Sequence, residues 1–486
     1  MASRMNHAEA IMWAVESDPF LRSDFTNVTV LSTPPDSARL RRSVTRAIAS
    51  YPPLRQRVVG SPLGLAPPLW GEDPDFDLDY HLRRVALPPP GTHRQLLDLA
   101  AVLAATPLDR ARPLWELTVV EGLDSGRSAV LQRLHHSLTD GVGAMKLARS
   151  LFERVPPEGA GTGPAPAWAP VANPLVWRRP EVLSPADLPP PGAIWPADAP
   201  AVPLGSIAGA LGFRLGQTIA AARRGFEVAS ALPWRSGDDL LALAGSAGRT
   251  ARSAADQVLV SGGALSPLLV GRSLGRYFAT ASLELAGVRR AARALGGGRN
   301  DIFVAGVTGA LLDYHQRMGA PCEALRMATA ISLRTGTGPT GGNHFAPARG
   351  VMPIGPKDPA ARLAATRRRL AALAAEPGIS LAEFLASVLS LVPAGLLAPA
   401  LRAQARTVDF ATSIVPGLRG RRWVAGAPVE GSWPIGPRLG CAANFTLASC
   451  GDRLGLGINL DPVAFSDPGA FVECLGDSFD ALLDVQ

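Results

Sequence analysis

A segment rich in proline, glycine and alanine, residues 153–202, interrupts an otherwise apolar and periodic chain. This composition offers too little apolar surface for packed elements and is typical of a linker or surface loop. Residues 204–261 then become rich in alanine, leucine and arginine at helical spacing. Because 486 residues with 47% hydrophobic content exceed what one compact core holds, we predict two domains, 1–155 and 263–486, joined by a linker and helices over 156–262.

Two apolar-rich runs in the N-terminal part predict an antiparallel hairpin. They cover Glu116–Leu123 and Ser128–Leu134, and the residues between them, Asp124-Ser125-Gly126, are typical of a turn. Directly after the second run stands His135-His136-Ser137-Leu138-Thr139-Asp140-Gly141, and apolar residues at roughly helical spacing follow from Val142. This HHxxxDG motif therefore lies between the end of a strand and the start of a helix, where sites are commonly built.

The paired histidines indicate acid–base chemistry. An imidazole can take a proton from a hydroxyl and give it to a leaving group near neutral pH, because its unperturbed pKa is close to that pH. His135 and His136 point to opposite sides of an extended strand, so one of them faces a given cavity, and our candidate is His136. Asp140 either accepts a hydrogen bond from an imidazole or locks the loop through an arginine, and the spacing favours the second role. Gly141 permits a tight backbone or a close approach of substrate.

Two other interpretations of the motif stay open on these residues alone. A buried, hydrogen-bonded core histidine with Asp140 as a helix cap is the better interpretation of an isolated histidine pair. A zinc site is the less favoured one, because adjacent histidines do not share a face and no further Cys/His cluster has ligand spacing. We therefore expect no metal.

Beyond this motif, the chain resembles the bacterial wax ester synthase/diacylglycerol acyltransferases, a family within the CoA-dependent acyltransferases that share HHxxxDG. The matching segments before the histidines are Pro52-Pro53-Leu54-Arg55, Trp70, Asp73–Leu82, Pro107-Leu108-Asp109 and Arg112–Glu116. Those after them are Ser266-Pro267-Leu268, Gly271-Arg272-Ser273, Asn300-Asp301-Ile302, Ala305–Leu311, Ile331–Arg334, Gly342-Asn343 and Val415-Pro416-Gly417. Their occurrence together, in this order, is far more specific than any one of them.

The resemblance implies both a fold and a reaction. The fold is of the α/β (α+β) class, with two chloramphenicol-acetyltransferase-like halves whose mixed sheets are flanked by helices around a shared active-site tunnel. The reaction transfers a long-chain acyl group from acyl-CoA to a long-chain alcohol or diacylglycerol, forming wax ester or triacylglycerol. His136 is the general base at the junction of the halves, and neither an acyl-enzyme nor a cofactor other than the substrate acyl-CoA is needed.

The same resemblance suggests roles for residues outside the histidine motif. Asn300, next to Asp301, is a candidate for a polar contact to the tetrahedral intermediate or to the bound alcohol, and a plain helix N-cap is the alternative. Arg55 is a candidate to pair with Asp140 and brace the loop, the alternative being a solvated arginine. One departure is Ile414 before Val-Pro-Gly, where the family usually has asparagine. A polar contact there is then missing or moved, which puts the acceptor in doubt.

Charge and cysteine usage bear on partners and location. The net charge of +7 is carried almost wholly by arginine and suits CoA phosphates or anionic lipid head groups. Its scattered distribution, without aromatic–basic platforms, does not indicate nucleic acid. Four cysteines without CxxC spacing and the lack of a signal-like N-terminus predict a cytoplasmic protein.

Residues Phe384–Leu401 are apolar and uncharged over almost the length of a membrane span. Pro393 and Pro399 interrupt the segment, so we predict a pair of helices and not a span. These helices line an acyl tunnel or rest on a membrane or lipid-droplet surface, and an ordinary buried helix is the alternative.

Two further functions remain as alternatives to the acyl transfer to lipid. The acceptor hydroxyl could belong to a specialised metabolite such as a polyketide or a sugar. The chain could also be a lipid-binding or lipid-droplet protein that retains the fold without turnover. The presence of both His136 and Asp140 argues against the second alternative.

Overall fold

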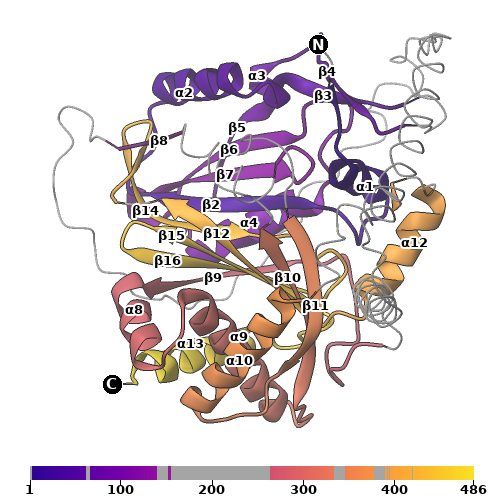
Figure 1. Ribbon diagram of the computed structural model, residues 1–486. Helices are drawn as coiled ribbons and strands as arrows, with labels where there is room; N and C mark the ends of the chain where they lie inside the picture. Colours follow the sequence, from indigo (N-terminus) through magenta and orange to yellow (C-terminus); the bar gives the residue numbers. More distant parts are fainter. Residues whose placement is uncertain are drawn as a thin grey trace, which may run out of the picture. The chain divides into compact units, whose positions relative to one another are not determined.

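The computed structural model describes residues 3–61, 66–139, 151–154, 263–332, 345–376, 389–390, 392, 394–418 and 420–485. Apart from Ser61 and Ala66, all of them belong to one compact unit. This unit holds a seven-stranded sheet, a six-stranded sheet and a small three-stranded sheet, with helices against them (Figure 1). The predicted class of mixed sheets flanked by helices is thus confirmed.

The seven-stranded sheet carries the histidine motif. Its strand order is β5-β6-β7-β2-β14-β13-β8. The bounds are β2 Asp24–Leu31, β5 Leu82–Ala86, β6 Trp115–Glu121, β7 Ser128–His135, β8 Phe152–Glu153, β13 Trp423–Val424 and β14 Ala427–Ile435. β6 and β7 pair antiparallel across the turn η3 (Asp124–Gly126), so the predicted hairpin is present, and His135 ends β7.

Part of this sheet comes from the far end of the chain. β14 pairs antiparallel with β2, from Ile435 opposite Thr26 to Val429 opposite Leu31 (Figure 1). A strand from the C-terminal part therefore completes the sheet of the N-terminal part. The limits predicted at residues 155 and 263 stay a prediction as domain boundaries.

The six-stranded sheet has the order β11-β10-β12-β15-β16-β9. Its strands are β9 Tyr277–Glu284, β10 Ala324–Ser332, β11 Phe345–Pro353, β12 Phe410–Leu418, β15 Ala443–Cys450 and β16 Arg453–Leu460. β10, β12 and β15 run parallel, and the outer pairs are antiparallel. This mixture is what the resemblance implied.

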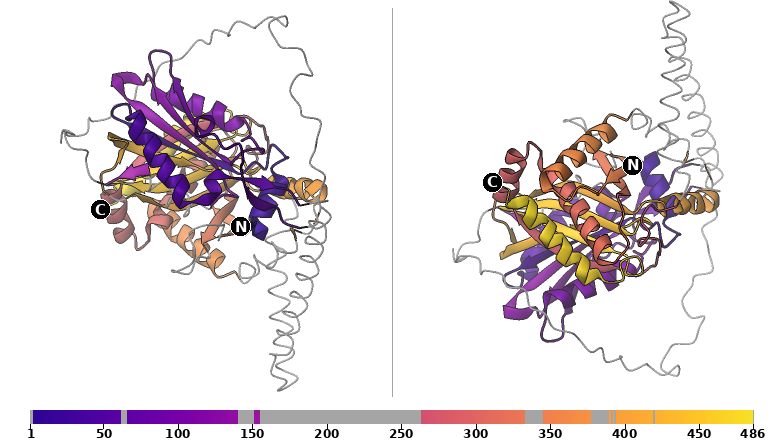
Figure 2. Two further views of the ribbon diagram at one scale, coloured as in Figure 1. Left: turned by 90° about the horizontal axis from the view of Figure 1, so that it is seen from above. Right: turned by 90° about the horizontal axis from the view of Figure 1, so that it is seen from below.

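Four helices cover one face of the six-stranded sheet: α8 (Leu285–Ala294), α9 (Arg299–Arg317), α10 (Pro359–Ala374) and α13 (Pro468–Leu483). Seen from below, α13 lies across the yellow strands (Figure 2). α9 and α13 approach closely because α9 offers glycines at the contact. A Cβ atom on Gly306 would lie 2.2 Å from the ring of Phe479, so only glycine fits there.

The remaining elements frame the N-terminal sheet. The small sheet consists of β1 (Ser3–Arg4), β4 (Leu69–Glu72) and β3 (Gln56–Val59). The helices are α1 His7–Val15, α2 Ser37–Ser50, η1 Pro52–Arg55, α3 Leu78–His81 and α4 His93–Ala105. α4 packs its apolar face on β2 and β7 and also against Phe278 of β9, so it contacts both large sheets.

One side chain at the start of α4 couples the packing of the sheets to pH. His93 Nε2 lies 2.8 Å from Thr280 Oγ1 of β9, and burial lowers the pKa of His93 to about 4. The imidazole is therefore neutral in the folded protein at neutral pH, whereas in the unfolded chain it takes up a proton near pH 6.5.

We expect this group to make the fold sensitive to mild acid. Its contribution is fully present above about pH 6.5 and is lost as the pH falls towards 4. Between pH 7 and pH 4.5 the free energy of unfolding should fall by roughly 2 kcal/mol more in the wild type than in His93→Gln. Urea titrations at the two pH values measure this difference. An equal fall of the free energy of unfolding in both proteins would refute the prediction.

The described part of the apolar segment forms α12 (Ala394–Ala405), which packs on α1 through Leu397 and Ala398. The predicted interruption at Pro399 is wrong, because the helix continues through it. Gly395, four residues earlier, is exposed, so its carbonyl can turn to water where the proline removes a hydrogen bond. Within the described ranges, no helix has the length and apolarity needed to cross a membrane. The predicted linker over 153–202 and the helices over 204–261 fall almost entirely outside those ranges.

Candidate active site

The first histidine of the motif is held inside the protein. His135 is 1% exposed, and its Nδ1 accepts the backbone N–H of Ser137 at 3.1 Å. Because Nδ1 accepts a hydrogen bond, the ring proton lies on Nε2. Nε2 is 3.0 Å from a carboxylate oxygen of Glu16 and 3.0 Å from the hydroxyl of Ser23. This side chain therefore anchors the loop.

The second histidine stands on the accessible side of the same loop. His136 is partly exposed, and its ring lies against Phe25 with 4.9 Å between the ring centroids. Its backbone N–H donates to the carbonyl of Ser23 at 3.0 Å. The alternation expected from strand geometry is thus present, with one histidine inside and one able to meet substrate. The catalytic role of His136 stays a prediction at this point.

Motifs from three other segments surround the loop. The indole N–H of Trp115 donates to the carbonyl of Leu54 at 2.7 Å, and His81 is 2.7 Å from the carbonyl of Trp115. The hydroxyl of Tyr51 donates to the carbonyl of Leu138 at 2.5 Å, directly after the histidines. The segments that carry the family resemblance before the histidines therefore build the frame of the loop.

A buried charge network lies behind the histidines. The guanidinium of Arg133 is 3.0 Å from the carboxylate of Glu116 and 3.2 Å from that of Asp24, and it donates to the carbonyl of Thr106 at 2.7 Å. Arg276, just before β9, adds a contact to Asp24 at 3.7 Å. We did not predict this network. The sequence feature that indicates it is a pair of opposite charges, Glu116 and Arg133, each within an apolar run. The register of the hairpin places these two residues opposite each other.

Glu16, which follows α1, connects both histidines to the body of the protein. Its carboxylate accepts hydrogen bonds from the ring N–H of His135 at 3.0 Å and from the backbone N–H of Ser23 at 3.1 Å. Ser23 in turn accepts the backbone N–H of His136. A single buried carboxylate therefore fixes the ring of one histidine and the backbone of the other. Sequence spacing gave no indication of this, because 119 residues separate Glu16 from His135.

We expect Glu16→Ala to lower kcat by about 10- to 100-fold with little change in KM, because a displaced loop misaligns the base without removing it. Glu9→Ala is the matched control, since Glu9 is a buried carboxylate of α1 that caps that helix and does not contact the histidines. Steady-state kinetics of both variants measure the effect. Equal losses of kcat in the two variants would show that only the stability of α1 matters.

The structure leaves the predicted roles of Asp140, Gly141 and Arg55 open. Asp140 and Gly141 lie outside the described residues, so their roles stay predictions. Arg55 lies at the end of η1, is about half exposed, and has its guanidinium 3.2 Å from the carboxylate of Glu72. Its proposed pairing with Asp140 is therefore untested.

The predicted Asn300–Asp301 site is the first turn of α9. A carboxylate oxygen of Asp301 accepts the backbone N–H of Gly298 at 2.7 Å, which is the capping role held open as the alternative. Asn300 is exposed. The structure thus supports the helix-terminus interpretation of this pair.

Asn300 and the histidines lie at opposite ends of the sheets. His135 pairs with Asp24, which contacts Arg276 at the start of β9. Asn300 instead follows Arg299, which lines the same pocket as Leu454. Leu454 pairs with Leu283, near the other end of β9. β9 has eight residues between these ends, which corresponds to about 23 Å. The capping contact does not exclude a second role, and the predicted contact of Asn300 to the intermediate or to the bound alcohol stays a prediction.

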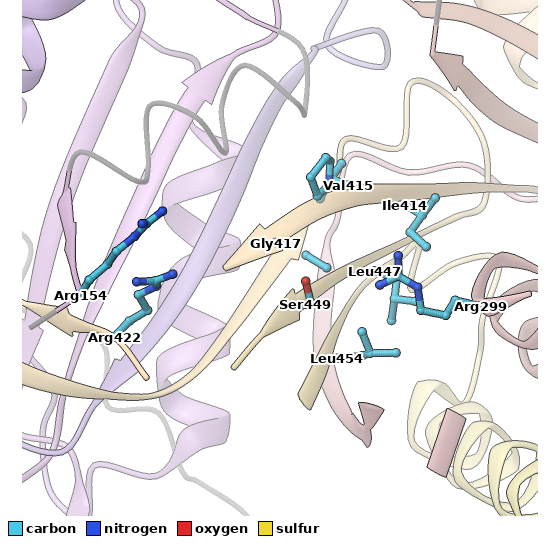
Figure 3. A pocket seen from close by; sticks show the side chains of 11 residues that line it. Arg154, Arg299, Ile414, Val415, Gly417, Arg422, Leu447, Ser449 and Leu454 are labelled. Carbon is cyan, nitrogen blue, oxygen red and sulfur yellow. The ribbon is translucent and has the colours of Figure 1, made fainter. Parts of the chain in front are cut away.

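At the Asn300 end, β12 and β15 border a pocket of about 530 Å³ (Figure 3). Its lining includes Ile414, the residue that departs from the family pattern and is 40% exposed here. The full lining is Arg154, Arg299, Ile414, Val415, Pro416, Gly417, Arg422, Leu447, Ala448, Ser449 and Leu454. Arg299, directly before the Asn-Asp segment, and the Val-Pro-Gly segment, more than a hundred residues later, therefore line one hollow.

The glycine of Val-Pro-Gly is required by a close approach of backbones. A Cβ atom on Gly417 would lie 1.7 Å from the carbonyl oxygen of Ser449. The register between β12 and β15 also shifts between Val415 and Leu418. The segment thus shapes the wall of the pocket at the end of β12.

Comparison with known families decides the identity of the fold. The family model described as the wax ester synthase/diacylglycerol acyltransferase catalytic domain matches residues 3–303. The model of the WS/DGAT C-terminal domain matches residues 341–483. The chain belongs to the wax ester synthase/diacylglycerol acyltransferase family. The resemblance drawn from its motifs is confirmed, and the chain is an acyltransferase of this family.

Curated relatives extend over nearly the whole chain. A putative diacylglycerol O-acyltransferase of Mycobacterium tuberculosis is 33% identical over 485 residues, covering 99% of this chain and 92% of the relative. A second one from the same organism is 30% identical over 481 residues, covering 95% and 93%. The similarity therefore includes both the histidine motif and the C-terminal sheet.

Solved structures show the same fold at lower identity. The wax ester synthase/diacylglycerol acyltransferase of Marinobacter aquaeolei has a TM-score of 0.61 and 20% identity, covering 99% of this chain and 98% of that one. The first condensation domain of the CDA synthetase has a TM-score of 0.55 and 16% identity, covering 100% and 97%. These likenesses bear on the fold alone, and they confirm the predicted fold class. The shared tunnel stays a prediction.

No set of three or more His, Cys, Asp or Glu side chains that could hold a metal ion occurs among the residues described. The four cysteines, Cys322, Cys441, Cys450 and Cys474, are all free thiols. Burial raises the pKa of Cys441 and of Cys450 to about 11, so neither is a ready nucleophile.

Proposed function

We propose that this chain transfers a long-chain acyl group from acyl-CoA to the hydroxyl of a long-chain alcohol or diacylglycerol, with His136 as general base. The products are wax ester or triacylglycerol and free CoA. The observation that carries the proposal is the placement of His136, in a chain of this family, on the accessible side of a loop that buried groups hold from behind.

The proposed reaction proceeds in two balanced steps. His136 takes the proton of the acceptor hydroxyl as its oxygen attacks the thioester carbon, forming a tetrahedral intermediate. The carbon–sulfur bond then breaks, and the CoA thiolate takes the proton from the imidazolium. Because a thioester already carries a good leaving group, the protein mainly aligns two substrates and moves one proton. The anchor of Glu16 and His135 serves this alignment.

We also propose that the enzyme works in the cytoplasm at the surface of a membrane or lipid droplet, where its acceptors and products reside. We take Leu396 on α12, which is 69% exposed, as the residue that contacts this surface. Sedimentation of the full chain with phosphatidylcholine vesicles tests this point. Leu396→Ser should weaken the association, and equal sedimentation of both proteins would count against α12 as the contact.

The release of CoA from palmitoyl-CoA tests the main proposal. We would offer hexadecanol, dioleoylglycerol or no acceptor, and we expect release that depends on one of the two lipids. If CoA is released only with a polyketide or sugar hydroxyl, the acceptor class would change and the proposed acyl transfer would stay the same. No release with any acceptor, despite binding of palmitoyl-CoA, would favour a lipid-binding protein.

A further inference from the structure

We infer that the pocket at the ends of β12 and β15 binds phosphate groups, those of the CoA half of the donor, through Arg154, Arg299 and Arg422. The inference rests on the proposed function, because it takes acyl-CoA to be the donor. It adds a second site, away from the histidines, for the charged part of that substrate.

The charge of the pocket lining favours an anion. Three of its eleven residues are arginines and none is acidic. Arg154 and Arg299 are exposed and have no carboxylate within ion-pair distance among the described residues, whereas Arg39 near by is 2.7 Å from Glu153. In Figure 3, Arg154 and Arg422 lie next to each other on one side of the hollow and Arg299 lies on the other. Phosphate groups bound in the hollow would therefore have guanidinium groups on both of its sides.

The apolar part of the lining suits the rest of the nucleotide. Ile414 is 40% exposed and lines the hollow together with Leu447 and Leu454. An asparagine at position 414 would offer hydrogen bonds, whereas isoleucine offers a surface for the flat face of an adenine ring. The departure from the family pattern therefore fits a pocket whose polar contacts come from arginines.

Positive charge continues beyond the pocket. Arg154 also borders an open hollow along α2, which is lined by Ala38, Arg39, Arg41, Arg42, Thr45, Arg46 and Glu153. Arg41 pairs with Asp79, but Arg42 has no such partner among the described residues. A field of this sign over a concave surface raises the local concentration of a polyanion such as CoA.

The donor and the side chains together can span the distance to the histidines. Strand register places the backbone of the pocket about 23 Å from the His136 loop. From the thioester carbon to the first phosphorus, acyl-CoA has about fourteen bonds, which extend to about 17 Å. The arginine and histidine side chains project from the backbone at the two ends and cover the remainder.

Binding of CoA to the full chain, measured by titration calorimetry at fixed salt, tests the inference. We expect Arg154→Ala and Arg299→Ala each to weaken CoA about ten-fold, and pantetheine, which lacks the phosphates, to bind all variants alike. Arg317→Ala is the matched control, because Arg299 and Arg317 are the first and last residues of the same helix. The control should bind CoA like the wild type, and Arg299→Lys should recover part of the loss.

Three results would overturn the inference. One is equal CoA affinity of the wild type and both arginine variants, and another is an equal loss in the Arg317→Ala control. The third is unchanged CoA binding with reduced binding to phosphatidylglycerol vesicles, which would assign the pocket to lipid head groups. Failure of the proposed function gives a different result: CoA binds in an arginine-dependent way, yet no acceptor causes its release.

Discussion

His136→Ala will lower the acceptor-dependent release of CoA by about 10²- to 10⁴-fold, which is the usual contribution of a general base. Among the described residues of the loop, the variant removes the imidazole that is partly exposed and able to meet substrate. Because Phe25 and the backbone contact to Ser23 remain, the loop itself should keep its shape. Initial rates at saturating palmitoyl-CoA measure the loss.

Binding and stability separate this effect from a folding defect. His136→Ala should bind CoA like the wild type and should unfold at a similar urea concentration, because the side chain is partly exposed. His135→Ala should instead lose stability, since it leaves the buried carboxylate of Glu16 without the ring that faces it. More than a tenth of wild-type turnover in His136→Ala would remove this residue from the mechanism.

Arg133→Met will lower the free energy of unfolding by about 3 kcal/mol, because it leaves the buried carboxylate of Asp24 without a close partner and Glu116 with Arg83 alone, at 3.0 Å. Arg133 is 3% exposed, and its partners Asp24 and Glu116 are buried as well. Asp24 keeps only the longer contact to Arg276 at 3.7 Å. Urea unfolding followed by circular dichroism measures the loss.

A surface pair provides the comparison for this network. Arg84 and Glu121 lie 2.8 Å apart but are half and two-fifths exposed, so Arg84→Met should cost less than about 1 kcal/mol. Adding Asp24→Asn to Arg133→Met should restore part of the loss, because it removes the buried charge that keeps only the contact to Arg276. A cost below about 1 kcal/mol for Arg133→Met alone would mean that water reaches the network.

The features that could be predicted from the sequence are those determined by residues close to one another in the chain. The hairpin and the position of the histidines at a strand end follow from alternation and a turn. The helix cap at Asp301 follows from the polar residues before an apolar helix. In each case, the residues that determine the structure lie within a few positions of one another.

Long-range pairing could not be derived in this way. The apolar pattern of Ala427–Ile435 does not indicate that this strand pairs with β2 rather than with the six-stranded sheet of the C-terminal part. Glu16 is one acidic residue after a short helix, and only the fold brings it to His135. The helix through Pro399 was missed because an exposed turn tolerates a lost hydrogen bond that a buried one does not.

Because β14 lies between β2 and β13, the seven-stranded sheet can be completed only late in the synthesis of the chain. A ribosome must reach residue 435 before the edge of β2 is covered, and until then a strand next to the histidine hairpin presents open backbone groups. Fragments that end with the matched catalytic region at residue 303 therefore lack a strand of the very sheet that holds the histidines. Production of the active enzyme depends on the last part of the chain as much as on the part that bears the motif.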